Sequence, residues 1–303
     1  MNRREFLKIT GAGMTGALLA DIHLPVAFAS EEKVFPSFVV ARGPVVADNL
    51  SSALKALGGI SRFVSRGDVV VVKPNIGWDR VPKQAANTNP ELVHSIVQNC
   101  YEAGAKKVKV FDKTCNDPRR CYVKSGIADS ARKAGADVSF VDDRKFKQVE
   151  LGGEVLDKWP VYAEVLECDK IINVPIAKHH GVAKLTMALK NWMGVIGEPR
   201  NVLHQQIDLC LSDLARFFRP ALTVLDATRI LVANGPQGGN VKDVRRLDTL
   251  VVGTDQVAID SYGSTFFGSR GTDLGYLVAA AKAGVGQVDL GKVHFSEIGA
   301  SSS

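Results

Sequence analysis

Lysine and histidine side chains follow one another closely in one stretch of the chain, and both types can move protons, bind anions or hold a metal ion. Lys178, His180 and Lys190 fall within this stretch, and His204 follows them. An imidazole or a neutral amine can act as a general acid or base. Imidazoles with a carboxylate such as that of Asp226 are usual ligands of zinc, nickel or iron. We therefore predict Lys178, His180 and Lys190 as catalytic residues, with His180, His204 and Asp226 as candidate ligands of a transition metal.

Lysine and amide side chains at the ends of apolar runs indicate a site for a small anionic molecule. Lys73 and Lys178 come just beyond apolar strands, and ammonium and amide groups hold a carboxylate or phosphate well. The structural alternatives are exposed lysines, C-terminal capping of a helix by Lys190, and histidines that bond a backbone carbonyl at a strand end. The residues predicted to bind substrate are Lys73, Asn75, Thr88, Asn191, Asn234 and Gly235.

The elements that must position these residues alternate along the chain between strand-like and helix-like segments. Strands are predicted at residues 38–41, 69–72, 108–111, 138–141, 170–174, 222–225 and 250–252. Helices are predicted at residues 47–57, from Pro90, and at 123–134, 184–189, 207–218, 257–267 and 273–283. This alternation predicts an α/β fold, a mainly parallel sheet with helices on both faces in a Rossmann-like three-layer sandwich. Ligands bind beyond the carboxyl ends of such strands, where most of the polar clusters fall.

The first thirty residues have the layout of a twin-arginine signal for export. Arg3 and Arg4 precede a modestly apolar, glycine-rich stretch, and the small-x-small sequence 27–29 follows it. This pattern predicts cleavage after Ala29, a single α/β domain over residues 30–303, and a periplasmic or otherwise exported protein. The apolar stretch is too short to span a bilayer, and no later segment is apolar enough. We therefore expect a processed protein that does not span the membrane.

Charge and cysteine spacing narrow the range of partners. The formal net charge of +6 over 303 residues is spread along the chain, which favours a small anionic partner and not nucleic acid. The five cysteines show no ferredoxin-type spacing, so no iron–sulfur cluster is expected within this chain. Cys115 and Cys121 enclose a short polar segment that leaves a disulfide open, whereas the other three lie in apolar stretches typical of buried thiols.

The order of the polar motifs resembles that of the domain of unknown function 362 family. The matching pieces are Lys73-Pro74-Asn75, Thr88-x-Pro90, Ser125-Gly126-Ile127, Pro175-x-x-Lys178-x-His180, Lys190-Asn191-x-x-Gly194, His204, Asp226, Asn234-Gly235-Pro236 and Gly253-x-Asp255-x-x-Ala258-x-Asp260. Adjacent side chains of an extended segment point to opposite sides, and His180, not His179, occupies the family position. The resemblance implies that His180 faces the site. Some family members carry a pair of ferredoxin-type iron–sulfur clusters, and this chain lacks their cysteine array.

Two functions from different classes fit these patterns. The first is an exported enzyme that uses a metal, or acid–base chemistry of histidine and lysine, on a small anionic substrate. The alternative is a non-catalytic or electron-transfer accessory protein that binds a periplasmic redox partner, which the resemblance and the export signal suggest. The glycine-rich piece 234–239 fits neither the dinucleotide nor the Walker pattern, and the chain lacks the GxSxG nucleophile motif, which disfavours those enzyme classes.

Overall fold

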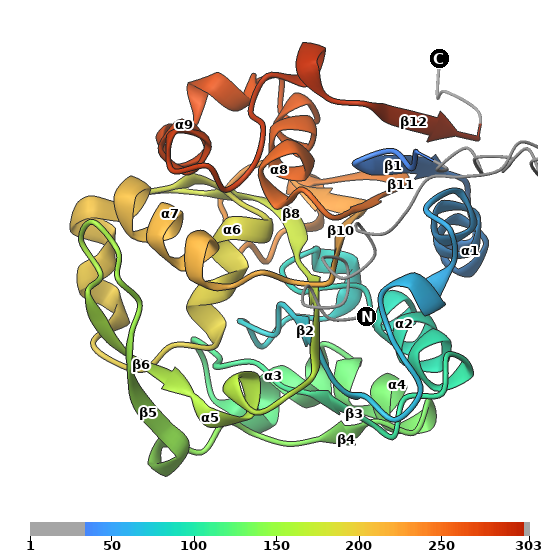
Figure 1. Ribbon diagram of the computed structural model, residues 1–303, viewed down its shortest axis with the longest axis horizontal. Coiled ribbons are helices and arrows are strands. Elements are labelled where there is room, and N and C mark those ends of the chain that lie inside the picture. Colours follow the sequence, from blue (N-terminus) through green and yellow to red (C-terminus); the bar gives the residue numbers. More distant parts are fainter. Residues whose placement is uncertain (1–33, 300–303) are drawn as a thin grey trace, which may run out of the picture. The chain divides into compact units, whose positions relative to one another are not determined.

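A ten-stranded sheet forms the centre of the computed structural model, which describes residues 34–299 (Figure 1). Its strands are β1 (Phe38–Arg42), β2 (Val69–Pro74), β3 (Lys107–Val110), β4 (Asp137–Val138), β7 (Lys170–Val174), β8 (Ile176–His180), β9 (Lys184–Thr186), β10 (Leu222–Leu231), β11 (Val244–Gly253) and β12 (Phe295–Ile298). The order along the sheet is β12, β1, β11, β10, β7, β2, β3 and β4, and β8 pairs with both β10 and β9. β11 and β9 run opposite to the other eight strands.

Helices cover both faces of this sheet, because its central strands are apolar on both sides. Val70 and Val72 of β2 belong to one hydrophobic core and Val71 to the other, as the alternation of side chains in a strand requires. Figure 1 shows α1, α2 and α4 on one side of the sheet and α6 to α9 on the other. The helices are α1 (Val46–Ala56), α2 (Pro90–Glu102), α3 (Pro118–Lys124), α4 (Ile127–Lys133), α5 (Ala163–Leu166), α6 (Ala188–Asn191), α7 (Ile207–Phe217), α8 (Gln256–Thr265) and α9 (Gly275–Lys282). The predicted α/β class, with a mainly parallel sheet, is confirmed.

Two of the predicted helices differ from the structure. The segment predicted as one helix at 123–134 is two short helices, because Gly126 has a φ of 74° and separates α3 from α4. The segment predicted as a helix at 184–189 begins with β9, which pairs antiparallel with β8, and only then turns into α6. Lys184 has a φ of 59°, which is incompatible with a right-handed helix there. The strand β8 itself was missed by the sequence analysis.

Outside the central sheet, β5 (Phe146–Glu150) and β6 (Lys158–Tyr162) form an antiparallel hairpin. In residues 34–299 no helix has the length and apolar character needed to cross a membrane. All five cysteines are free thiols, including Cys115 and Cys121. The predicted twin-arginine signal lies outside the described residues.

Candidate active site

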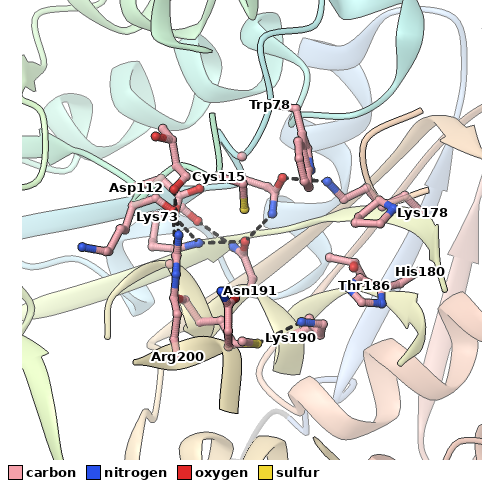
Figure 2. A pocket seen from close by; sticks show the side chains of 18 of the residues that line it. Lys73, Trp78, Asp112, Cys115, Lys178, His180, Thr186, Lys190, Asn191 and Arg200 are labelled. Carbon is pink, nitrogen blue, oxygen red and sulfur yellow. Dashed lines mark hydrogen bonds and ion pairs between the residues drawn. The ribbon is translucent and has the colours of Figure 1, made fainter. Parts of the chain in front are cut away.

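A cavity of about 480 Å³ opens where the carboxyl ends of β2 and β3 meet β8, α6 and the 3-10 segment Arg200–Gln206. Figure 2 shows Lys178, His180 and Thr186 along one side of this cavity and Asp112 and Arg200 toward the other. Among the residues that line it are five lysine and arginine side chains, Lys73, Lys113, Lys178, Lys190 and Arg200, against the two carboxylates Asp112 and Glu198. The cavity is therefore positively charged, as a site for an anion requires.

A buried ion pair lies under the cavity. The Nζ atom of Lys73 lies 2.9 Å from Oδ1 of Asp112, and the two side chains are 1 % and 2 % exposed. Burial lowers the pKa of Lys73, and the charge of Asp112 opposes that effect. Asp112 also accepts a 2.6 Å hydrogen bond from the backbone N–H of Ile76. A Cβ atom on Gly194 would lie only 1.7 Å from Oδ1 of Asp112, so this position requires a glycine.

Asn191 organises the cavity floor instead of presenting free groups to a ligand. Its Nδ2 donates to the carbonyl of Lys73 at 3.1 Å and to Oδ1 of Asn173 at 2.8 Å. Its Oδ1 accepts from Lys73 Nζ at 2.8 Å and from Asn75 Nδ2 at 3.2 Å. An amide has two donors and two acceptor sites, so the hydrogen-bonding capacity of Asn191 is filled within the protein. It holds β2, β7 and the loop after β2 together around the cavity.

Lys178 and Lys190 face the cavity without a carboxylate partner among the described residues. Lys178 Nζ donates to Oδ1 of Asn75 at 3.0 Å and to the carbonyl of Ala86 at 2.5 Å. Lys190 Nζ contacts Sδ of Met193 at 2.9 Å and Nε2 of His204 at 3.4 Å. Burial lowers the pKa of Lys178 to about 7 and that of Lys190 to about 8. Both amines are thus close to the balance between charged and neutral forms at neutral pH.

The hydrogen bonds of His180 fix its tautomer. Its Nδ1 accepts from the backbone N–H groups of Val182 and Ala183, each at 3.1 Å. In the neutral ring the proton is then on Nε2, so Nε2–H is the group available to the cavity. Burial, reinforced by the charge of Lys190, lowers the pKa of His180 to about 3. His180 in its neutral form is therefore a hydrogen-bond donor toward the cavity.

His204 has the complementary tautomer. Its Nδ1 lies 3.1 Å from the carbonyl of Asn201, which requires a proton on that nitrogen, and its Nε2 is then free to accept from Lys190. Its ring stacks on that of His180 with 5.7 Å between the centroids. Burial lowers the pKa of His204, so this ring is also neutral at neutral pH.

The structure does not assemble the predicted metal set of His180, His204 and Asp226. A ligating histidine donates its second ring nitrogen to an acceptor, whereas Nδ1 of His180 accepts and leaves Nε2 protonated. Asp226 does not line this cavity: its carboxylate accepts from the backbone of Asn89 and from Thr228. In the part of the chain that the structure describes, no group of three or more His, Cys, Asp or Glu side chains is placed to hold a metal ion. These residues do not fit a bound metal.

Three other predicted residues support the cavity from behind. Thr88 Oγ1 accepts from the backbone N–H of Asn75 at 2.8 Å and donates to the carbonyl of Val174. Asn234 bonds Asp243, and the backbone N–H of Gly235 donates to Nδ1 of His179. His179 thus secures the loop that brings Pro236 to the cavity. None of the three presents its side chain to the cavity.

Several lining residues were not among the predicted site residues. Asp112 was recognisable in principle, because it follows strand β3 as Lys73 ends β2. Trp78, Cys115 and Arg200 come from loops whose path the sequence does not define. The Arg200 guanidinium donates to the carbonyls of Lys113, Thr114 and Met193, which ties the loop after β3 to the end of α6. Arg200 adds positive charge while most of its donors are occupied.

The fold and the cavity define an α/β protein with a cavity lined by basic side chains at the carboxyl end of a mainly parallel sheet. The chain belongs to the family described as domain of unknown function DUF362, whose model matches residues 70–265. It is 26 % identical over 220 residues to a thylakoid-associated protein of Synechocystis, which covers 70 % of this chain and 67 % of that relative. A solved structure similar to it is the lactate racemase apoprotein from Thermoanaerobacterium thermosaccharolyticum, with a TM-score of 0.42 and 10 % identity over 75 % of this chain. This chain spans 56 % of the length of that structure.

Proposed function

We propose that this protein is an enzyme that binds a small anionic substrate in the cavity and acts on it by proton transfer through its lysine and histidine side chains. The observation that carries the proposal is the pair Lys178 and Lys190, two buried lysines without a carboxylate partner in residues 34–299. An unpaired buried charge is costly, and an anionic ligand supplies the missing partner. Lys73, whose charge is already paired with Asp112, serves as a contrast within the same site.

Each group then has a distinct role. Lys190, whose pKa of about 8 keeps it mostly charged at pH 7, holds the anionic group of the substrate. Lys178 has a pKa of about 7 and exchanges a proton with the substrate, because a group whose pKa is near the operating pH is the most effective acid or base. The Nε2–H of His180 donates to an oxygen on which negative charge develops.

Anion binding is tested first, by thermal unfolding with lactate, pyruvate, isethionate and phosphate. A ligand that binds only the native state raises the unfolding temperature. We expect stabilisation of the unaltered protein, a much smaller effect in Lys190→Gln, and an unchanged effect in Lys55→Gln, whose side chain is exposed on α1. Equal stabilisation of the Lys190→Gln variant, or none of the unaltered protein, would refute the anion site and leave the accessory role as the better hypothesis.

Proton transfer is tested by exchange of carbon-bound hydrogen in D2O. Lactate, pyruvate and other small carboxylates are incubated with the protein, and loss of the α- or β-proton signal is followed by NMR. We expect catalysed exchange for at least one of them, and its loss in Lys178→Gln. Binding without any exchange would restrict the function to binding of the anion.

We further propose that the protein works outside the cytoplasm after twin-arginine export. The support for this part is Arg3 and Arg4 ahead of a glycine-rich apolar stretch and the small-x-small sequence at 27–29. Because this pathway carries folded proteins, the cavity would already be formed when the protein is exported.

A further inference from the structure

We infer that Lys178 is a nucleophile that forms an imine with a substrate carrying both a carbonyl group and a carboxylate, a 2-oxo acid in the simplest case. The inference rests on the proposed anion site and adds the substrate class and a covalent step. It is carried by the hydrogen bonds around one nitrogen atom and by the donor beside it.

The environment of Lys178 Nζ matches a neutral amine. A neutral amine has two N–H bonds and one lone pair, and two acceptors surround this nitrogen, Oδ1 of Asn75 at 3.0 Å and the carbonyl of Ala86 at 2.5 Å. With both hydrogens donated to these oxygens, the lone pair is unused and the nitrogen lines the cavity. Lys73 differs, because its Nζ lies against the Asp112 carboxylate, which favours the ammonium form.

Burial keeps this amine reactive. Lys178 is 1 % exposed, and burial is the main cause that lowers its pKa. The charges of Lys190 and Lys73 act in the same direction, against those of Cys115 and Asp112. A lysine that is desolvated or placed near another cation is the kind that forms Schiff bases with carbonyl substrates. Asn75 is itself fixed by Thr88 and Asn191, so the acceptor that orients the amine is rigid.

His180 supplies the donor that a carbonyl oxygen needs. Lys178 and His180 are two residues apart on β8 and therefore share one side of the strand, and both line the cavity. Nδ1 of His180 is committed to the turn at Val182 and Ala183, so its Nε2–H is available to the substrate. An amine lone pair and an imidazole N–H side by side are suited to the carbon and the oxygen of one carbonyl group.

The chemical step is balanced by groups in the cavity. The Lys178 nitrogen attacks the carbonyl carbon, the C=O π electrons move to oxygen, and a proton passes from nitrogen to that oxygen to give a carbinolamine. Lys190, in its ammonium form, then gives a proton to the hydroxyl group, which leaves as water while the C=N bond of an iminium forms. Amine, carbonyl and the proton given by Lys190 are converted to iminium and water without any oxidant or reductant.

The second buried lysine, Lys190, is the reason to expect a carboxylate on the substrate. Lys190 lies on the same cavity, and its contacts, Met193 Sδ and His204 Nε2, carry no negative charge. A carboxylate bound near Lys190 supplies that charge and brings the adjacent carbonyl toward the Lys178 side. A simple aldehyde or ketone would leave the Lys190 charge without a partner and is therefore expected to react less.

Trapping with borohydride tests this inference. The full chain is incubated with glyoxylate, pyruvate or 2-oxoglutarate, reduced with sodium borohydride, and analysed by intact mass and peptide mapping. We expect one saturable adduct on the peptide that contains Lys178, suppressed by excess isethionate and at least tenfold weaker with acetone. Lys178→Arg, which keeps N–H donors but removes the nucleophilic amine, should lose the adduct, whereas Lys55→Arg should not.

The outcomes separate this inference from the anion site on which it rests. Stabilisation by these acids in thermal unfolding without an adduct at Lys178 overturns the imine and leaves the proposed function intact. Adducts spread over exposed lysines, or equal labelling of Lys178→Arg, overturn it as well. If the acids neither stabilise the protein nor label Lys178, the anion site and the imine fail together.

Discussion

The ammonium group of Lys73 lies 2.9 Å from the carboxylate of Asp112 in a place where both side chains are almost fully buried. The pair joins the last part of β2 to Asp112, two residues past the end of β3. These two strands are neighbours, and the cavity opens at their carboxyl ends. It neutralises one cation of the cavity from within the protein. Arg200 is paired with Glu198 at 3.2 Å and Lys113 with Asp143 at 2.5 Å. The positive charge left for a ligand therefore belongs mainly to Lys178 and Lys190.

Asp112→Asn should strongly destabilise the protein, because it leaves the buried charge of Lys73 without a counter-ion. Removing one partner of a buried pair costs about 3–5 kcal/mol, and urea unfolding at neutral pH measures this loss. The matched control is Asp137→Asn, which breaks an exposed pair with Lys107 and should cost no more than about 1 kcal/mol. A similar loss of unfolding free energy in the two variants would show that the buried pair stabilises the protein no more than the exposed pair does.

Gly194→Ala should distort the cavity floor. A Cβ atom there would lie 1.7 Å from Oδ1 of Asp112 and 2.6 Å from Nζ of Lys73, so the ion pair has to separate. We expect a loss of several kcal/mol in the free energy of unfolding, by analogy with other overpacked or unpaired buried sites, together with weaker anion binding. Gly181→Ala is the control, since an added Cβ meets nothing within 4 Å there, and it should leave stability and binding nearly unchanged.

The sequence predicted the layers of the fold well because apolar runs such as Val69–Val72 record burial on both faces of a sheet. The rule of strand carboxyl ends selected Lys73, Asn75, Lys178 and His180, and these four residues line one cavity. Their predicted roles in binding and catalysis stay predictions. The hairpin of β8 and β9 was missed because its polar, histidine-containing sequence lacks the usual strand pattern. The tautomer of His180 depends on two backbone N–H groups whose position only the folded chain defines.

Lys178→Met should remove a pH dependence of stability. The folded-state pKa of Lys178 is lowered from 10.5 to about 7, so the native state binds fewer protons than the unfolded state between these values. The stability of the unaltered protein thus gains up to about 1.4 kcal/mol per pH unit from this group as the pH rises from 7 to 10.5. Below pH 7 the amine is charged in both the folded and the unfolded state, so its destabilising effect no longer changes with pH.

Urea unfolding of both proteins at several pH values measures this effect as a difference, which cancels the contributions of other titrating groups. The stability of Lys178→Met relative to the unaltered protein should be greatest at pH 7 and below, and should decline toward pH 10.5. A difference that stays constant over this range would mean that the amine has an ordinary pKa in the folded protein.

Replacing Arg3 and Arg4 together by lysine should block export while leaving the folded domain intact, because the twin-arginine route reads this pair. Cell fractionation and the size of the processed chain measure the effect, and we expect unprocessed protein in the cytoplasm. Lys8→Arg, which keeps the charge and the pair, is the matched control. Normal export of the double-lysine variant would place the protein on another route or in another compartment.

His180 has two separable functions, and two substitutions distinguish them. In His180→Asn the amide oxygen takes the place of Nδ1 and continues to accept from Val182 and Ala183, but no donor remains at the position of Nε2. In His180→Phe both functions are lost. We expect His180→Asn to keep the stability of the unaltered protein to within about 1 kcal/mol. His180→Phe leaves the buried N–H of Ala183 unpaired and loses more, since a buried unpaired donor costs about 1–3 kcal/mol.

Both variants should lose function to a similar degree, because both lack the Nε2–H that faces the cavity. Loss of one hydrogen bond to a charged oxygen is worth about 1.5–3 kcal/mol, which corresponds to a fall of at least about tenfold in the rate of hydrogen exchange or of adduct formation. Thermal stabilisation by the test anions should change less, since we propose that Lys190 and not His180 binds the anionic group. If His180→Asn retained full exchange and labelling rates, the only role of the His180 ring would be to accept the backbone hydrogen bonds of the turn between β8 and β9.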